Sequence, residues 1–175
     1  SGKKDNKFEK AAINELSSLK GSTLDIGCGN LYFYPVLKQM AEEKKIIYMG
    51  VDPLKTIIKN KHMKFLQKRF EDVKFKDNSF NNILMLGSYN HVQDITFVLR
   101  QVYNILKPEG TLLVSDDEPI IILGKEKKSG KKEFEHYRNS SAAEAERNLI
   151  RLGFRIKKRT VVSEKTGNIW LIKCA

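Results

Sequence analysis

Short apolar runs alternate with helical segments along this chain, and this alternation constrains its fold more than any other feature. Runs of strand length cover residues 23–26, 45–51, 62–68, 80–86 and 111–115. Segments with helical spacing of apolar residues precede or separate them at 8–19, 31–44, 56–61 and 92–106. Strands that alternate with helices are typical of βαβ units, whose right-handed crossovers place helices on both faces of a parallel sheet. The pattern therefore predicts an α/β fold.

The end of the chain predicts a different arrangement of strands. A helical segment over residues 142–152 ends at Gly153, and two β-rich runs follow at 154–162 and 168–174. The turn between these runs is short, so we expect an antiparallel hairpin. Neither an internal repeat nor a linker divides the sequence, which predicts one domain over residues 1–175.

Length and composition narrow the class of protein. The 175 residues are 41% hydrophobic, which suffices for one buried core. No run approaches the roughly 18 apolar residues of a membrane span, and the N-terminal residues lack an apolar signal segment, so we expect no membrane partner. Cys28 and Cys174 make neither a disulfide framework nor a metal cluster. These features favour a cytoplasmic protein without a metal site.

A glycine turn and a carboxylate mark the candidate binding site. Gly27 and Gly29 follow the first predicted strand and precede a predicted helix, where glycines permit a tight turn and close approach of a ligand. Asp52 ends the second strand, 25 positions after Gly27. A carboxylate there can accept hydrogen bonds from the hydroxyls of a ribose or can cap a helix after Pro53. With the glycine turn in register, we favour the ribose role.

At these residues the chain resembles a known family. Residues 24–29, Leu-Asp-Ile-Gly-Cys-Gly, resemble the first motif of class I methyltransferases, which reads Asp-x-Gly-x-Gly-x-Gly. Further segments resemble the small-molecule (type 11-like) branch of that family in order and spacing, at residues 50–52, 70–75, 79–92, 106–112 and 149–154. The resemblance extends from residue 24 to the C-terminus.

The resemblance implies a three-layer, Rossmann-like sandwich whose seven-stranded, mostly parallel sheet has its last strand antiparallel. It also implies S-adenosylmethionine as the methyl donor, with S-adenosylhomocysteine as the product. The residues that it assigns to the donor pocket are Asp25, Gly27, Cys28, Gly29, Asp52, Pro53, Phe70, Glu71, Leu86, Gly87 and Tyr89. Residues 1–21 would form an N-terminal helix, and residues 118–140 a variable insert on the acceptor side.

Three positions depart from the family pattern. Leu31 stands at the third glycine of the first motif, where we expect it to narrow the space near the donor. Arg69 stands where a carboxylate commonly accepts a hydrogen bond from the adenine amino group. Asn81 replaces the Asp of a Phe-Asp motif. Each departure is tolerable on its own, and the three together leave open the alternative in which donor binding is weakened or lost.

The catalytic residue stays open at this stage. Methyl transfer from a sulfonium mainly requires alignment of donor and acceptor, and a general base is needed only for an acceptor that carries a proton. The candidates for that base are Asp116, His91 and His136. Each has an ordinary alternative: Asp116 as the start of a solvated loop, His91 as a capping or packing residue, and His136 as part of a surface pair with Tyr137.

The charge distribution leaves the acceptor open as well. Residues 125–175 hold 14 Lys/Arg and 6 Asp/Glu, whereas residues 1–124 hold 18 and 15. We expect a small-molecule acceptor. The alternatives are RNA or another polyanion bound through this basic third, which includes the Lys-rich run 125–132, and a non-catalytic binding domain. A nicotinamide dehydrogenase is disfavoured because Tyr32 stands at the third glycine of its motif.

Overall fold

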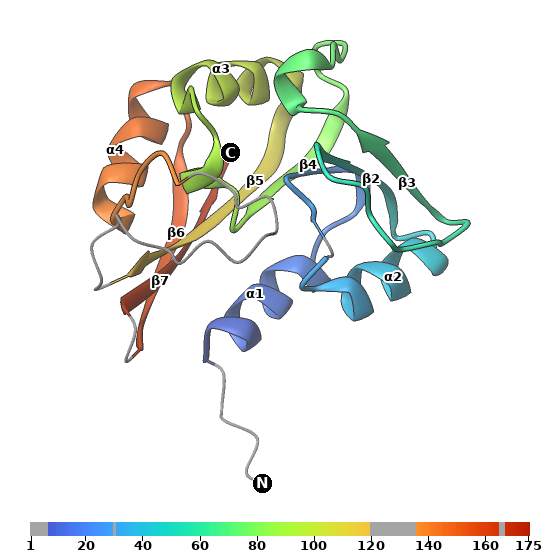
Figure 1. Cartoon of the computed structure of the whole chain (residues 1–175), viewed down its shortest axis with the longest axis horizontal. Helices are drawn as coiled ribbons and strands as arrows, with labels where there is room; N and C mark the ends of the chain where they lie inside the picture. Colours follow the sequence, from blue (N-terminus) through green and yellow to red (C-terminus); the bar gives the residue numbers. More distant parts are fainter. Residues whose placement is uncertain (1–6, 30, 120–135, 165–166) are drawn as a thin grey trace, which may run out of the picture.

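Seven strands form a single sheet in the order β3-β2-β1-β4-β5-β7-β6 (Figure 1). The computed structural model describes residues 7–29, 31–119, 136–164 and 167–175. The strands are β1 (Gly21–Ile26), β2 (Ile46–Asp52), β3 (Met63–Gln67), β4 (Phe80–Leu86), β5 (Leu106–Pro119), β6 (Ile156–Glu164) and β7 (Gly167–Cys174). Strands β1 to β5 pair in parallel, and β7 runs antiparallel to both β5 and β6. The predicted sheet is confirmed.

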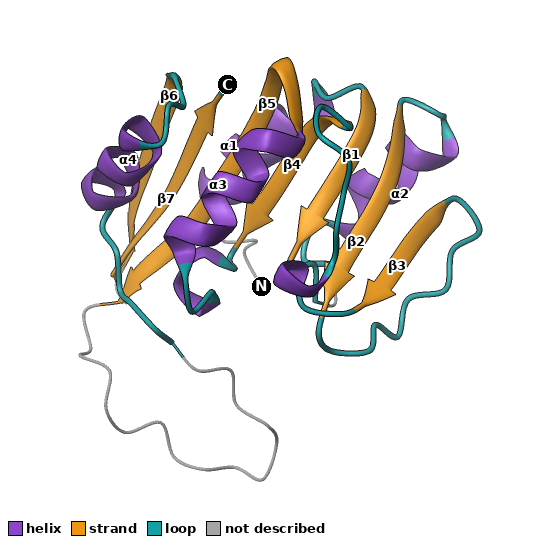
Figure 2. Cartoon of the chain, turned by 90° about the horizontal axis from the view of Figure 1, so that it is seen from above, coloured by secondary structure: helices purple, strands orange, loops and turns teal. Residues whose placement is uncertain are grey.

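Helices cover both faces of the sheet, which gives three layers (Figure 2). One face carries α1 (Lys7–Ser17) and α2 (Tyr34–Glu42), and the other carries α3 (Ile95–Ile105) and α4 (Ala142–Arg151). On the first face, Leu16 of α1 belongs to the same buried cluster as Leu84 of β4. On the second, Leu99 and Leu149 belong to a cluster with Ile83 of β4. Neighbouring residues of β4 thus serve opposite cores, as strand alternation requires.

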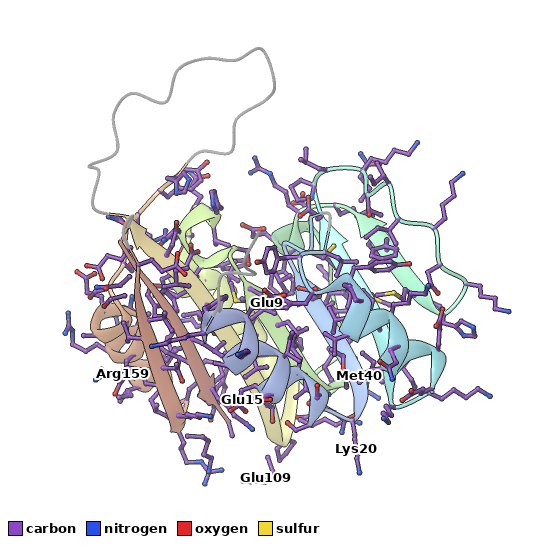
Figure 3. All side chains as sticks on the ribbon, turned by 90° about the horizontal axis from the view of Figure 1, so that it is seen from below. Glu9, Glu15, Lys20, Met40, Glu109 and Arg159 are labelled. Atoms are coloured by element: carbon purple, nitrogen blue, oxygen red, sulfur yellow. The ribbon has the colours of Figure 1, made fainter. Side chains whose placement is uncertain are left out.

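An ion-pair network fastens α1 to the C-terminal hairpin. The Glu15 carboxylate, which is largely buried, accepts hydrogen bonds from Lys158 Nζ at 2.8 Å and from Lys173 Nζ at 2.9 Å (Figure 3). Burial acts to raise the pKa of Glu15, but the two lysines outweigh it and leave that pKa below its ordinary value. The helix α1 is therefore fastened directly to β6 and β7 of the sheet.

Polar side chains define where α3 and α4 begin. Asp94 accepts a hydrogen bond from the amide of Phe97 at 2.9 Å, so α3 starts at Ile95 rather than at the predicted residue 92. A 3₁₀ turn, η2 (Tyr89–His91), occupies part of the preceding connection. Ser141 and Glu144 form a reciprocal capping box at the start of α4.

The prediction of a helix over residues 56–61 is wrong. The connection from β2 to β3 is a loop that runs around the outer side of β3 (Figure 2). Three consecutive β-branched residues, Thr56, Ile57 and Ile58, disfavour a helix there, and Ile58 instead packs against the buried cluster under α2. Within the described residues, no helix is long and apolar enough to cross a membrane.

Candidate functional site

A cavity of about 610 Å³ opens at the carboxyl ends of β1, β2 and β4. The strand order reverses here, because β2 lies on one side of β1 and β4 on the other. Open α/β sheets bind ligands at this position. The residues that line the cavity are Ile26, Gly27, Gly29, Val51, Asp52, Pro53, Leu54, Arg69, Phe70, Glu71, Gly87, Ser88, His91, Val92, Gln93 and Tyr137.

The two glycines after β1 serve different purposes. Gly27 has a φ of +71°, and a Cβ there would lie 2.5 Å from the Cβ of Ser88. The Ser88 hydroxyl in turn donates to the carbonyl of Ile26 at 2.7 Å, which joins the ends of β1 and β4. Gly29 has a φ of +48°, and a Cβ there would meet no atom within 4 Å. Gly27 therefore permits close packing, whereas Gly29 leaves the cavity open.

Asp52 connects the loops after β1 and β2. Its Oδ2 accepts a hydrogen bond from the amide of Gly29, and its Oδ1 accepts one from the amide of Leu54, both at 2.8 Å. The side chain is buried and yet borders the cavity. A carboxylate has about four acceptor positions, so two remain for a ligand.

The remaining walls come from the segments after β3 and β4. Phe70 and Glu71 belong to a 3₁₀ turn, η1 (Phe70–Asp72), and the Phe70 ring stacks on Phe75 with centroids 6.2 Å apart. Gly87 has a φ of +82°, and a Cβ there would meet nothing within 4 Å. Its amide donates to the carbonyl of Ser115 in β5 at 2.9 Å. Gly87 thus leaves open space after β4, as Gly29 does after β1.

The comparisons with known proteins agree with this geometry. A family model described as "Methyltransferase domain" matches residues 24–114, just over half of the chain. The chain belongs to the class I, S-adenosylmethionine-dependent methyltransferases.

Relatives of this methyltransferase domain occur among curated proteins and solved structures. The ubiquinone/menaquinone biosynthesis C-methyltransferase of Escherichia coli is 33% identical over 79 residues, which are 45% of this chain and 32% of that protein. The matched segment therefore spans about one third of the curated relative's length.

Two solved structures illustrate the shared fold. An S-adenosylmethionine-dependent methyltransferase from Mesorhizobium loti superposes with a TM-score of 0.72 and 16% identity, covering 97% of this chain and 98% of the other. A 1,6-didemethyltoxoflavin-N1-methyltransferase from Burkholderia thailandensis, bound to its substrate and S-adenosylhomocysteine, gives a TM-score of 0.70 at 16% identity, covering 97% and 80%.

Seven of the residues that the sequence assigned to the donor pocket of this methyltransferase domain line the cavity. They are Gly27, Gly29, Asp52, Pro53, Phe70, Glu71 and Gly87. Four others, Asp25, Cys28, Leu86 and Tyr89, are not among its lining residues.

Packing explains where these four residues lie. Asp25 is buried in β1 and its Oδ2 accepts a hydrogen bond from the Tyr48 hydroxyl at 2.7 Å. Burial raises the pKa of Asp25 to about 7, an effect that Tyr48 opposes and the charge of Asp52 reinforces. Cys28 is buried in the cluster under α2, and Leu86 packs against that cluster. Tyr89 is fully buried.

The Tyr89 ring contacts Trp170 edge to face, with centroids 5.4 Å apart. Its hydroxyl accepts a hydrogen bond from Asn148 Nδ2 at 3.0 Å. Tyr89 therefore belongs to the core between β4, β7 and α4 rather than to the cavity wall.

Two of the three departures from the family pattern lie away from the cavity. Leu31, with a φ of +55°, is buried beside Phe33 and Leu37 and is not among the residues that line the cavity, so the structure does not support the expectation that it narrows the donor space. Asn81 lies near the amino end of β4, where its Oδ1 accepts hydrogen bonds from the amide and hydroxyl of Ser22. Arg69 does line the cavity and is exposed.

The candidate catalytic residues fall into two groups. His91 lines the cavity, and its ring lies 4.1 Å from the ring of His136, centroid to centroid. His136 is not a lining residue, but its neighbour Tyr137 is. Asp116 is buried away from the cavity, where its carboxylate accepts hydrogen bonds from the amides of Asn90 and Asp117, both at 2.8 Å. Burial raises the pKa of Asp116 to about 7.

A polar network that the sequence did not reveal seals the carboxyl edge beside β4 and β5. The Asn90 side chain donates to the carbonyl of Asp117 at 2.9 Å and accepts from the amide of Ser140 at 3.2 Å. The carbonyl of Ser140 accepts a hydrogen bond from Trp170 Nε1 at 2.9 Å. Asn90 was visible only as part of the segment after the fourth strand; its partners are distant in sequence.

Arg138 completes this network. Its guanidinium donates to the carbonyls of Tyr89, Val92 and Gln93, and desolvation lowers its pKa. The segment from residue 136 is thereby fixed across the loop after β4, with Tyr137 at the cavity. The basic run 125–132, which the sequence offered as a polyanion contact, lies outside the described residues.

Proposed function

We propose that this chain transfers the methyl group of S-adenosylmethionine to a small-molecule acceptor. The observation that carries the proposal is the cavity at the reversal of strand order, where Gly29 and Gly87 leave open space and Asp52 presents a carboxylate. Its volume falls within the range of pockets that bind cofactors and small ligands. The family membership supports the donor, because class I methyltransferases use S-adenosylmethionine.

The lining residues suit the parts of the donor. Asp52 retains acceptor positions for the two hydroxyls of a ribose. Phe70 offers an apolar surface for the adenine ring, while Glu71 beside it offers an acceptor for the amino group of adenine. Gly27 and Gly29 bring backbone close to the methionine end without a Cβ in the way. Asp25 does not line the cavity, so it would support this end only indirectly, through its hydrogen bond from the Tyr48 hydroxyl.

The residues near Gly87 would position the acceptor. When bound, S-adenosylmethionine supplies a methyl group that its positively charged sulfur has already activated for displacement. The protein then contributes mainly alignment, which can account for several kcal/mol of the barrier. For an acceptor that carries a proton, His91 is the cavity-lining residue suited to accept it, and the ring of His136 lies beside it at a tilt of 53°.

A small molecule is the favoured acceptor class for two reasons. The relatives named above are a quinone-biosynthesis C-methyltransferase and a toxoflavin N1-methyltransferase, which methylate small molecules. In addition, four basic side chains among the described residues of the C-terminal third are paired with carboxylates of the protein itself: Lys158 and Lys173 with Glu15, Arg155 with Glu109, and Arg159 with Glu146.

A labelling experiment tests the proposal. The protein is incubated with S-adenosylmethionine carrying an isotopic label in its methyl group and with separate small-molecule, RNA and protein fractions of a cell extract. We expect label to enter the small-molecule fraction and the Gly29→Val variant to abolish it. Label in RNA or protein alone would contradict the acceptor class. Absence of transfer to all fractions, with S-adenosylhomocysteine still bound, would favour a non-catalytic binding domain.

A further inference from the structure

The segment that follows β2 and includes β3, residues 53–69, carries charges of one sign only. It contains six basic residues and no acidic residue. The six are Lys55, Lys59, Lys61, Lys64, Lys68 and Arg69. All are exposed, and within the described part of the chain none of them forms an ion pair. In Figure 3, several side chains that end in nitrogen project outward from this edge of the sheet.

Aliphatic side chains stand exposed among these charges. Ile57 is 81% exposed, the largest value among the large hydrophobic side chains of the described residues, and Leu54 is 43% exposed. The next residue, Ile58, packs against the core and anchors the loop. Of the two ring side chains in this segment, His62 is exposed, whereas Phe65, the larger stacking surface, is mostly buried and packs near Tyr48 with centroids 5.8 Å apart.

This surface adjoins the cavity at both of its ends. Pro53 and Leu54, where the segment begins, line the cavity, and so does Arg69, where it ends. Whatever binds the loop therefore lies next to the mouth of the cavity.

We propose that residues 53–69 bind the surface of an anionic phospholipid bilayer, with Ile57 inserted among the headgroups and the lysines against phosphate. Basic residues near an anionic membrane attract it, and an inserted aliphatic side chain adds hydrophobic burial. Exposed aliphatic rather than aromatic side chains favour a lipid surface over single-stranded RNA, which binds by stacking on aromatic rings. Peripheral contact of this kind requires no membrane-spanning helix. It differs from the expectation of no membrane partner that we drew from the sequence.

Vesicle binding of the full chain tests this proposal without any methyl donor. The protein is sedimented with vesicles of phosphatidylglycerol and phosphatidylcholine, and with vesicles of phosphatidylcholine alone, at about 0.1 M salt. We expect binding to the anionic vesicles only. The variant Lys55→Glu/Lys59→Glu/Lys61→Glu should bind at least about 100-fold more weakly, since each basic residue near the surface contributes about fivefold. Ile57→Ser should weaken binding about tenfold.

A matched variant controls for net charge. Arg147→Glu/Arg151→Glu/Lys157→Glu removes the same charge from exposed positions of the C-terminal third, and we expect it to bind vesicles within about threefold of the wild type. Thermal unfolding of each variant confirms that it folds. Equal loss in both triple variants would overturn the proposal, as would failure to bind anionic vesicles. Tighter binding to single-stranded RNA, insensitive to Ile57→Ser, would assign the surface to nucleic acid instead.

A separate titration with S-adenosylhomocysteine keeps this test distinct from the proposed function. Because none of the substituted residues lines the cavity, the variants should bind it as the wild type does. If a variant loses vesicle binding but still binds S-adenosylhomocysteine, the result bears on the proposed membrane surface alone. If the wild type binds vesicles but not S-adenosylhomocysteine, the result bears on the proposed donor cavity alone.

Discussion

The carboxyl edge of the sheet is built in two contrasting ways. Beside β1 and β2, Gly29 leaves space, and Asp52 fixes the surrounding loops through backbone amides. Beside β4 and β5, Asn90 and Arg138 satisfy buried backbone groups and close the structure. The cavity therefore exists because glycines place no side chain there, whereas buried polar side chains stabilise the other part of the same edge. Substitutions should therefore separate donor affinity from stability.

The largest loss of stability is expected on the sealed side. Asn90→Ala leaves the buried amide of Ser140 and the carbonyl of Asp117 without their partner. Unsatisfied buried groups cost about 1–3 kcal/mol each, so the free energy of unfolding should fall by about 3 kcal/mol in urea titrations. Asn148→Ala, which removes one partially buried hydrogen bond to Tyr89, serves as a control and should cost about 1 kcal/mol. Equal losses in both variants would contradict the comparison.

On the open side, affinity rather than stability should change. Gly29→Val fills the space above Gly29, so the dissociation constant for S-adenosylhomocysteine should rise at least about 100-fold, about 3 kcal/mol. The free energy of unfolding should fall by only about 1 kcal/mol, the typical cost of a positive φ outside glycine. Calorimetry and urea unfolding measure the two quantities.

Gly27→Ala is the matched control for Gly29→Val. Its Cβ would lie 2.5 Å from that of Ser88, so the loss of stability should exceed that of Gly29→Val. If Gly27→Ala leaves stability unchanged, the distinction between the two glycines is wrong.

The pH dependence of stability should reveal the buried carboxyl beneath the open side. Burial raises the pKa of Asp25 to about 7, above the unfolded value of about 4. Between pH 4 and 7 the folded state therefore holds a proton that the unfolded state has lost, and stability falls as pH rises. Asp25→Asn removes this loss while retaining an acceptor for Tyr48.

At pH 8 the Asp25→Asn variant should exceed the wild type in free energy of unfolding by up to about 4 kcal/mol, and at pH 4 the two should agree. Chemical unfolding at both pH values measures the difference. A stability difference between variant and wild type that is no larger at pH 8 than at pH 4 would show that Asp25 ionises at low cost and would contradict this prediction.

The smallest effect concerns Leu31. Leu31→Gly relieves a positive φ but removes a buried side chain, so the free energy of unfolding should fall by about 2 kcal/mol. Donor affinity should stay within about twofold of the wild type, because Leu31 does not line the cavity. Calorimetric titration of the variant with S-adenosylhomocysteine measures this, and tighter binding would restore the idea that Leu31 narrows the donor space.

The sequence predicted the sheet well because strand periodicity and the glycine turn are local signals. Residues 80–86 were predicted as a strand and form β4 over the same range. The loop around β3 was mistaken for a helix because hydrophobic spacing was weighed above β-branching at Thr56, Ile57 and Ile58. The placement of Tyr89 could not be foreseen, since its partners Trp170 and Asn148 are distant in sequence.

The candidate site, too, could be predicted only where the sequence carries a local signal. The positions of Gly29, Asp52 and Gly87 follow from strand ends, which the sequence marks directly. Whether Asp25 and Leu31 face the cavity or the core depends on the Tyr48 hydroxyl and on the left-handed backbone at Leu31, and neither is encoded in a motif.

Calorimetric titration of the wild type and of Asp52→Ala with S-adenosylhomocysteine tests the central claim most directly. We expect micromolar binding to the wild type and an affinity at least about 50-fold lower in the variant, since both the ribose acceptor and the anchor of the Gly29 loop are removed. Absence of binding to the folded wild type, or unchanged binding to Asp52→Ala, would contradict the assignment of this cavity to the donor.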